Sequence, residues 1–269
     1  MYNIYVKNLG HEAEVNKPPV KHPGFKPSCY VYSSEFSILI DVTKDIFDQL
    51  NIEEILNLDA ILLTHAHSDS IGGFAKLNDF LKKSKIVLPL YLHFENINIL
   101  KTKFKDLTQF EFKPLSNNDS FKIKDVFIKS FFVYHDLLEK FPTLGYTLYI
   151  GEYSVCYASD FGFKKGWEKV YDLKALSNNT LAILDGAYWD VKGNLWNHVS
   201  VLDHLDIILT FNNKYTYFTG YGNTYPKDLD KAELILNYLL LFRKTIDPSC
   251  KVEKLGLVKD MQVFNLTKL

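Results

Sequence analysis

Short apolar runs alternate along the chain with segments whose apolar residues are spaced as in helices. The runs are rich in β-branched and aromatic residues, which fit the pleated and partly buried surface of a strand. They predict strands at residues 29–33, 36–42, 60–63, 86–90, 126–133, 146–150, 153–158 and 181–184. The first two runs are separated by Ser34 and Glu35 and predict a hairpin.

Helical spacing and its boundary residues predict the remaining elements. We expect helices at residues 45–56, 74–81, 199–211 and 229–241, the last beginning after Pro226 and ending before Pro248. Strands that are joined partly by hairpins and partly by helices indicate mixed sheets with helices outside. The pattern therefore predicts an α/β protein, and two packed sheets would fit it.

Length and composition fit one large domain that spans residues 1–269. Apolar residues make up 47% of the 269 residues, which is enough for a substantial core. No Gly/Ser-rich linker marks a boundary. The N-terminal residues lack the pattern of a signal peptide, and no apolar stretch reaches membrane-spanning length, so we expect a cytoplasmic protein that does not enter a membrane.

Cysteine usage and charge exclude some classes of protein. The three cysteines, Cys29, Cys156 and Cys250, are odd in number and far apart, which indicates a reducing compartment and structural thiols. The net charge is −1 and Arg243 is the only arginine. A broad field that attracts polyanions is therefore not expected, and nucleic acid is a disfavoured, though open, substrate.

The segment Thr64-His65-Ala66-His67-Ser68-Asp69 carries the strongest chemical signal. It follows the apolar run at 60–63, where a loop can present side chains to a cleft. Alternate residues of an extended segment share a face, so His65, His67 and Asp69 are predicted to project together. Two imidazoles and a carboxylate form a ligand set for zinc, iron or manganese.

This segment, with Ile71-Gly72-Gly73 after it, resembles the His-x-His-x-Asp-His signature of the metallo-β-lactamase fold superfamily. The resemblance implies a four-layered αββα sandwich. In that family the two histidines help to hold a first metal, and the aspartate and the next histidine help to hold a second. Ser70 stands where the family has that next histidine, so the second site matches only in part.

Later positions follow the family in the order in which they occur. The resemblance implies that His135 is the third ligand of the first metal and that Asp160 is the carboxylate that bridges both metals. His198 is similar to the histidine that phosphodiesterase branches use as proton donor or phosphate ligand. At the family's last metal histidine this chain has no histidine, and Asn223 there is either a weak oxygen ligand or a turn residue.

The closing segment, residues 259–263, resembles the last strand of the branch that contains ribonuclease Z, cyclic phosphodiesterases and the pyrroloquinoline quinone biosynthesis B-like proteins. Four histidines match nothing in the family, and we interpret them as structural or surface residues. They are His11, His22, His93 and His204.

These residues together predict a metal-dependent hydrolase that acts on a small phosphodiester or cyclic phosphate. Zinc is the expected cofactor, with manganese or iron open, as one or two ions; such an ion lowers the pKa of a bound water to about 7. Asp69 would serve as general base or orient the water where the second site is empty, and His198 would protonate the leaving oxygen or neutralise developing charge. A non-hydrolytic or degenerate member in cofactor biosynthesis or partner binding is the alternative, and assembly into a homodimer stays open.

Overall fold

The chain folds into two sheets because its apolar runs bury side chains on both of their faces. In β3 (Ser37–Ile40), Ile38 and Ile40 join the core between the sheets, whereas Leu39 joins a second core beneath the helices. Alternate residues of a strand point to opposite faces, so a continuous apolar run fits a strand that is covered on both sides. The computed structural model describes residues 2–12, 24–135, 141–191 and 197–269.

Within these described residues, each sheet has seven strands. The first sheet contains, in spatial order, β14 (Gln262–Asn265), β1 (Tyr5–Gly10), β2 (Ser28–Tyr32), β3, β4 (Ala60–Leu62), β5 (Leu88–His93) and β6 (Phe110–Leu115). The second contains β13 (Lys254–Leu257), β12 (Tyr215–Thr219), β11 (Leu181–Asp185), β10 (Tyr153–Ala158), β9 (Thr143–Ile150), β8 (Val126–Val133) and β7 (Ser120–Ile123). In each sheet a parallel half adjoins an antiparallel half.

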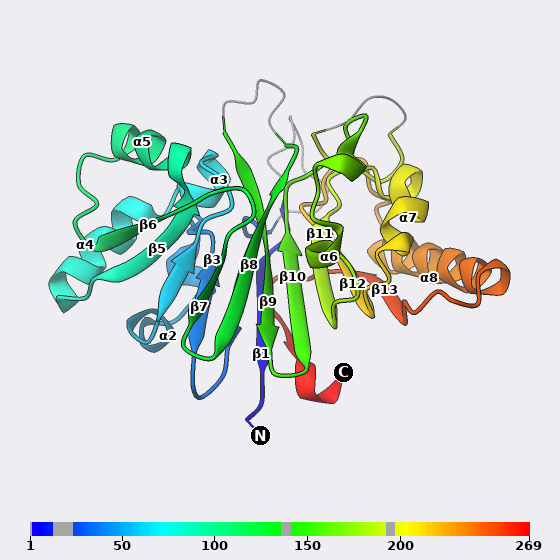
Figure 1. Ribbon diagram of the computed structural model, residues 1–269, viewed down its shortest axis with the longest axis horizontal. Helices are drawn as coiled ribbons and strands as arrows, with labels where there is room; N and C mark the ends of the chain where they lie inside the picture. Colours follow the sequence, from blue (N-terminus) through cyan, green and yellow to red (C-terminus); the bar gives the residue numbers. More distant parts are fainter. Residues whose placement is uncertain (1, 13–23, 136–140, 192–196) are drawn as a thin grey trace.

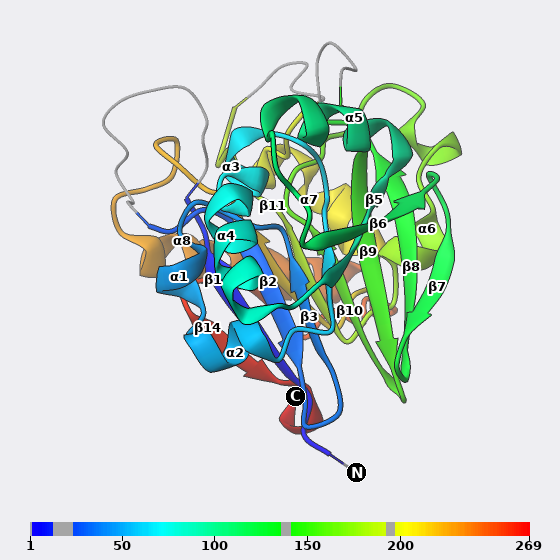
Figure 2. The same ribbon diagram turned by 90° about the vertical axis from the view of Figure 1, so that its left-hand side faces the viewer.

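Helices cover the outer faces of both sheets. The first sheet is accompanied by α1 (Ile46–Gln49), α2 (Ile52–Leu56), α3 (Ser68–Ile71), α4 (Phe74–Ser84) and α5 (Phe94–Lys103). The second is accompanied by α6 (Leu173–Leu176), α7 (Val201–Thr210) and α8 (Leu229–Ile246), with 3₁₀ turns at Trp167–Lys169 and Leu266–Lys268. Figure 1 shows α4 and α5 on one flank and α7 and α8 on the other, with the sheets between them. In Figure 2, α2 and α4 lie in front of the strands of the first sheet. The predicted αββα sandwich is confirmed.

The structure matches some predicted elements and corrects others. The strands predicted at 126–133 and 153–158 have those bounds. The single helix predicted at 45–56 is wrong: Leu50 is extended, and Asn51 begins a second helix through a capping box with Glu54. The strand predicted at 86–90 begins later, at Leu88, and the helix predicted at 199–211 begins at Val201.

The end of α8 and the start of β14 both lie later in the chain than predicted. The helix predicted at 229–241 continues to Ile246. The closing strand predicted at 259–263 begins at Gln262, because Met261 takes a left-handed conformation with φ 59°. His22 lies outside the described residues. None of the helices in the described part of the chain combines the length and apolar character that crossing a membrane requires.

Two of the three cysteines are buried, which leads to a prediction about thiol reactivity. Burial raises the pKa of Cys156 to about 12 and also raises that of Cys29. Because the thiolate is the reactive form, Ellman's reagent is expected to modify only the partly exposed Cys250 in the native protein. All three thiols should react after denaturation. Rapid reaction of a second thiol under native conditions would contradict the buried placement.

Candidate metal centre

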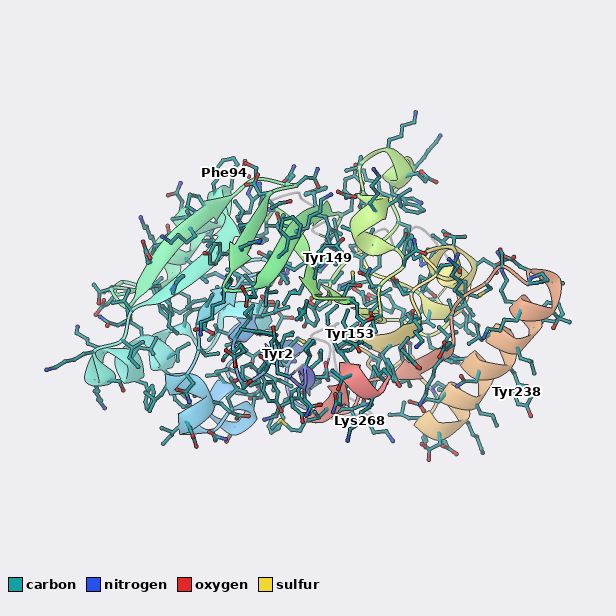
Figure 3. The ribbon with its side chains drawn as sticks, turned by 60° about the horizontal axis from the view of Figure 1, so that its bottom comes forward. Tyr2, Phe94, Tyr149, Tyr153, Tyr238 and Lys268 are labelled. Carbon is teal, nitrogen blue, oxygen red and sulfur yellow. The ribbon has the colours of Figure 1, made fainter. Side chains whose placement is uncertain are left out.

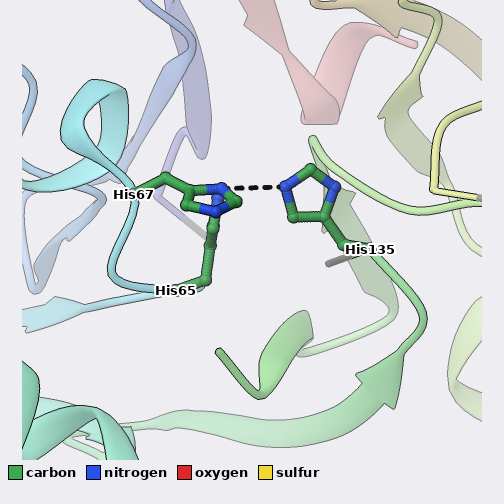
Figure 4. A group of neighbouring side chains, drawn as sticks. All are labelled: His65, His67 and His135. Carbon is green, nitrogen blue, oxygen red and sulfur yellow. Dashed lines mark hydrogen bonds between the residues drawn. The ribbon is translucent and has the colours of Figure 1, made fainter. Parts of the chain in front are cut away.

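Three imidazoles from distant parts of the chain converge where the two sheets meet. His65 and His67 lie in the loop between β4 and α3, and His135 follows β8 of the other sheet. Their ring centroids lie 4.6 to 4.9 Å apart. One nitrogen from each ring belongs to a group whose atoms all lie within 4.8 Å of one another. Figure 4 shows the three rings turned toward one another.

The spacing of one pair of ligand atoms is close to that expected on a single ion. The Nδ1 atom of His67 lies 3.0 Å from Nε2 of His135. Two nitrogens on one tetrahedral zinc ion, each about 2.0–2.1 Å from it, lie about 3.3 Å apart. The pair is therefore already close to the separation that a shared ion requires.

His65 presents the clearest sign of a missing partner. Its Nε2 atom is buried and has no hydrogen-bond partner among the described residues. Such an atom destabilises a fold by about 1–3 kcal/mol unless something satisfies it. Burial also lowers the pKa of His65 well below its ordinary value, so the ring is neutral and can offer a lone pair. The residues present fit a divalent cation.

A hydrogen-bond relay sets the tautomer of His65. The Thr64 hydroxyl has one proton and donates it to Asp41, at 2.8 Å from Oδ2. The same hydroxyl oxygen lies 2.8 Å from Nδ1 of His65 and can only accept there. The ring proton is therefore on Nδ1, and the lone pair of Nε2 faces the cluster. Sequence reasoning missed Asp41, although it follows the apolar residues of β3 directly.

The relay predicts a loss of metal affinity in Thr64→Val. The variant removes the acceptor that fixes the His65 tautomer, so metal affinity is expected to fall about 10- to 100-fold. A zinc titration against a chromogenic chelator measures this, and Thr64→Ser should restore affinity. Thr147→Val is the matched control, since Thr147 is also buried and bonds a backbone carbonyl. Unchanged zinc affinity in Thr64→Val would refute the relay.

Asp160 extends the centre on the side of the second sheet. It follows β10, and its Oδ1 atom lies 3.9 Å from Nε2 of His135. Burial alone raises the pKa of Asp160, but the neighbouring imidazoles, His135 first among them, outweigh burial and hold the pKa below its ordinary value. The carboxylate is thus charged and available as an oxygen ligand. A second metal-compatible group consists of His135, Asp160 and His198.

His198 is held by a buried aspartate that sequence reasoning missed. Its Nδ1 atom lies 2.7 Å from Oδ2 of Asp185, the last residue of β11, which leaves Nε2 for the cluster. Asp185 also accepts three backbone N–H bonds, from residues Phe161, Ala187 and Val199. Burial by itself lowers the pKa of His198, but Asp185 and the hydrogen bond to it raise this pKa to about 9.

Asp69 is placed differently from the strict alternation predicted for it. The extended conformation ends at His67, because α3 begins at Ser68, and Asp69 lies in its first turn. Its Oδ1 atom accepts the N–H of Ser70 at 3.0 Å. Within the described residues, Asp69 belongs to neither of the two metal-compatible groups. Its role as ligand or base stays a prediction.

The structure also places the other positions singled out in the sequence. Ser70 is buried, with its hydroxyl 3.5 Å from Nδ1 of His65. Asn223 is exposed and lies in a turn. His11 pairs with Asp260 at 2.6 Å, and His204 accepts the N–H of Ser200 at the start of α7.

A cavity of about 480 Å³ adjoins the centre. His135 belongs to its lining together with the rings of Phe94, Phe132, Tyr134 and Phe141 and the side chain of Lys164. The ring of Phe141 also contacts His67, at 4.8 Å between centroids. His135 therefore connects the metal-compatible groups to a cavity whose lining includes four aromatic rings and several polar side chains.

The two-sheet sandwich, with imidazoles and a carboxylate gathered between the sheets, defines a class of metal-binding protein. A family model described as a beta-lactamase superfamily domain matches residues 37–221. The chain belongs to that superfamily, as its His-x-His-x-Asp segment predicts.

Solved structures show the same fold over nearly the whole chain. The metallo-β-lactamase fold protein YhfI from Bacillus subtilis has a TM-score of 0.76 at 16% identity and covers 98% of this chain and 100% of its own. A diphosphatase from the PhnP family has a TM-score of 0.76 at 20% identity and covers 98% of each chain. Zinc-bound PqqB from Methylobacterium extorquens has a TM-score of 0.66 at 14% identity, over 97% of this chain and 99% of its own.

One curated relative matches a short segment. The hydroxyacylglutathione hydrolase of Francisella philomiragia subsp. philomiragia is 46% identical over 48 residues. The match spans 18% of this chain and only 19% of that enzyme.

Proposed function

We propose that this protein is a metal-dependent phosphodiesterase that acts on a small phosphodiester or cyclic phosphate. The observation that carries the proposal is the convergence of His65, His67 and His135. The Nε2 atom of His65 is buried there and has no hydrogen-bond partner among the described residues. The superfamily is generally hydrolytic, and a PhnP-family diphosphatase is among the chains with this fold. A zinc ion bound there would supply an acidified water as nucleophile and a Lewis acid for the phosphoryl oxygen.

The protein's own residues divide the remaining work. Asp160 supplies negative charge next to His135, which favours a cation between them. Asp185 accepts the Nδ1–H of His198, orients the ring and favours its protonated form, so that the Nε2–H can be transferred to the leaving oxygen or the charged ring can neutralise its charge. Asp69 would orient the attacking water. One ion is the minimal form, since Ser70 replaces a ligand histidine of the second site.

The replacement of family histidines also supports a second candidate function, in which the protein is a non-hydrolytic member of the superfamily. Ser70 and Asn223 occupy positions where the family has metal histidines. A protein that binds metal but has lost the second site could serve in cofactor biosynthesis or partner binding. Fold alone does not separate these functions.

An assay on purified protein tests the proposal. Metal-free protein receives zinc, manganese or iron(II) in turn, with bis(p-nitrophenyl) phosphate and a nucleoside 2′,3′-cyclic phosphate as substrates. We expect hydrolysis that a chelator abolishes and one of these metals restores. An acyl-glutathione thioester serves as comparison because of the short hydrolase match. Metal binding without turnover of either phosphodiester would overturn the proposal and support the second candidate.

A further inference from the structure

The aromatic cavity beside His135 has the chemistry of a base-binding pocket. Phe132 and Tyr134 meet edge to face, with ring centroids 5.4 Å apart, and Phe94 is 51% exposed. Flat apolar rings next to a metal centre favour a planar organic group attached to the reacting phosphate. The volume, about 480 Å³, lies in the range of small-molecule sites.

Polar groups in the same lining distinguish a heterocycle from a plain aromatic ring. Glu95 and Asn117 line the cavity, together with His93. Amide and carboxylate groups can pair with the N–H and C=O edges of a nucleobase. The Nζ atom of Lys164 lies 5.2 Å from the ring centroid of Tyr134, so a positive charge is present for the phosphate.

We propose that this pocket binds the base of a nucleoside-bearing phosphodiester, with Phe94 and Tyr134 as stacking residues and Lys164 near the phosphate. The inference rests on the proposed function and names the substrate class of that site. Phe94 is the most informative residue to substitute, because its exposed ring can be removed with little effect on the core.

Two esters with the same leaving group isolate the contribution of the base. Thymidine 5′-(p-nitrophenyl phosphate) and methyl p-nitrophenyl phosphate differ only in the organic group. We expect a preference for the thymidine ester, and Phe94→Ala should reduce its kcat/KM about 5- to 100-fold, mainly through KM. Hydrolysis of the methyl ester should not change. Phe127→Ala is the control, since Phe127 is a 39% exposed phenylalanine of β8 outside the cavity lining.

A binding measurement separates failure of the pocket from failure of the enzyme activity. Calorimetry compares thymidine 5′-monophosphate with inorganic phosphate on the zinc-loaded protein. Tighter binding of the nucleotide that is lost in Phe94→Ala supports the pocket even if neither ester is hydrolysed. Equal hydrolysis of both esters, with no preference for the nucleotide over phosphate, overturns the pocket and leaves the proposed function standing.

A separate surface lies on α8, whose outer face is almost wholly apolar. The helix packs against the sheet through Ala232, Leu236 and Leu240, and the side chain of Asn237 bonds the carbonyl of Leu255 in β13. Seven large apolar side chains are between 37% and 65% exposed on the opposite side: Leu234, Ile235, Tyr238, Leu239, Leu241, Phe242 and Ile246. Figure 3 places Tyr238 on the outer side of the helix.

The extent of this face argues for a protein partner. The seven side chains expose roughly 700 Å², more than the largest patch of a typical monomer, about 300–600 Å². It is close to the ~800 Å² that one partner contributes to a standard interface. The polar exposed residues of α8 are Asp230 at its start, Lys231 and Thr245, so most of the exposed surface of this helix is apolar.

The charges at the ends of α8 indicate the partner. Asp230 lies in the first turn and Lys244 in the last turn, and helical geometry places both on the same edge of the apolar face. If two copies of α8 pack antiparallel about a twofold axis, Asp230 of one copy lies near Lys244 of the other. We infer that α8 is the interface of a homodimer.

Sedimentation velocity tests this inference. We expect a dimer, and Tyr238→Glu and Phe242→Glu should each give a folded monomer, with folding checked by circular dichroism. Ile52→Glu, which places the same charge on an exposed apolar residue of α2, should leave the dimer intact. Asp230→Lys should weaken the dimer, and adding Lys244→Glu should restore it. A wild-type monomer overturns the inference, and so does a monomer that binds phosphatidylglycerol vesicles through this face.

Discussion

Replacing His135 with alanine is expected to remove both the metal and the activity. His135 is the residue shared by the two metal-compatible groups, so its loss leaves neither of them with three ligands. We expect bound zinc to fall to background and phosphodiester hydrolysis to fall at least about a thousandfold, since the ion supplies several kcal/mol of transition-state stabilisation. Elemental analysis and the bis(p-nitrophenyl) phosphate assay measure the two effects.

The control for this variant is His11→Ala. His11 is also mostly buried and also lies close to a polar partner, Asp260, but it is in neither metal-compatible group. It should keep the wild-type metal content and rate. Full zinc occupancy in His135→Ala would contradict this placement, because the ion would then bind elsewhere.

His198→Asn is expected to separate catalysis from metal binding. Asparagine can still donate a hydrogen bond to Asp185, but it cannot transfer a proton, so kcat should fall about 10²- to 10⁴-fold. Zinc content should stay at the wild-type level, because His65, His67 and His135 remain. The loss should be smaller for p-nitrophenyl esters than for alkyl esters, since p-nitrophenolate is a good leaving group that needs little protonation.

That comparison of leaving groups makes the role of His198 testable. If His198 were a metal ligand, its replacement would lower zinc occupancy and slow all esters equally. A structural role would instead lower the melting temperature and leave the ratio between the two ester types unchanged. His204→Asn is the matched control, because it makes the same substitution at the histidine within α7.

The gathering of metal-compatible residues could be predicted because the signal is local. His65 and His67 alternate directly after β4, and His135 and Asp160 each follow a strand of the second sheet. Strand ends that meet at one edge of a sandwich bring such residues together, so position after an apolar run is informative. The family resemblance predicts the order in which these ligand residues occur along the chain.

Residues that act through another residue could not be predicted in the same way. Asp41 and Asp185 also follow or end apolar runs, and this signal was present in the sequence. Their importance depends on tertiary partners, Thr64 for Asp41 and His198 for Asp185, which no local pattern contains. The break at Leu50 was missed for a related reason, because a capping box at Asn51 overrides continuous helical spacing.

The origin of the imidazoles in both sheets has a consequence for heat resistance. An ion held by His65, His67 and His135 would join the two halves of the sandwich as a removable crosslink. The native state alone would bind it tightly, so at a free zinc concentration a thousand times the dissociation constant the fold would gain about 4 kcal/mol. Cells starved of zinc would then contain a protein that is not only idle but also easier to melt and degrade.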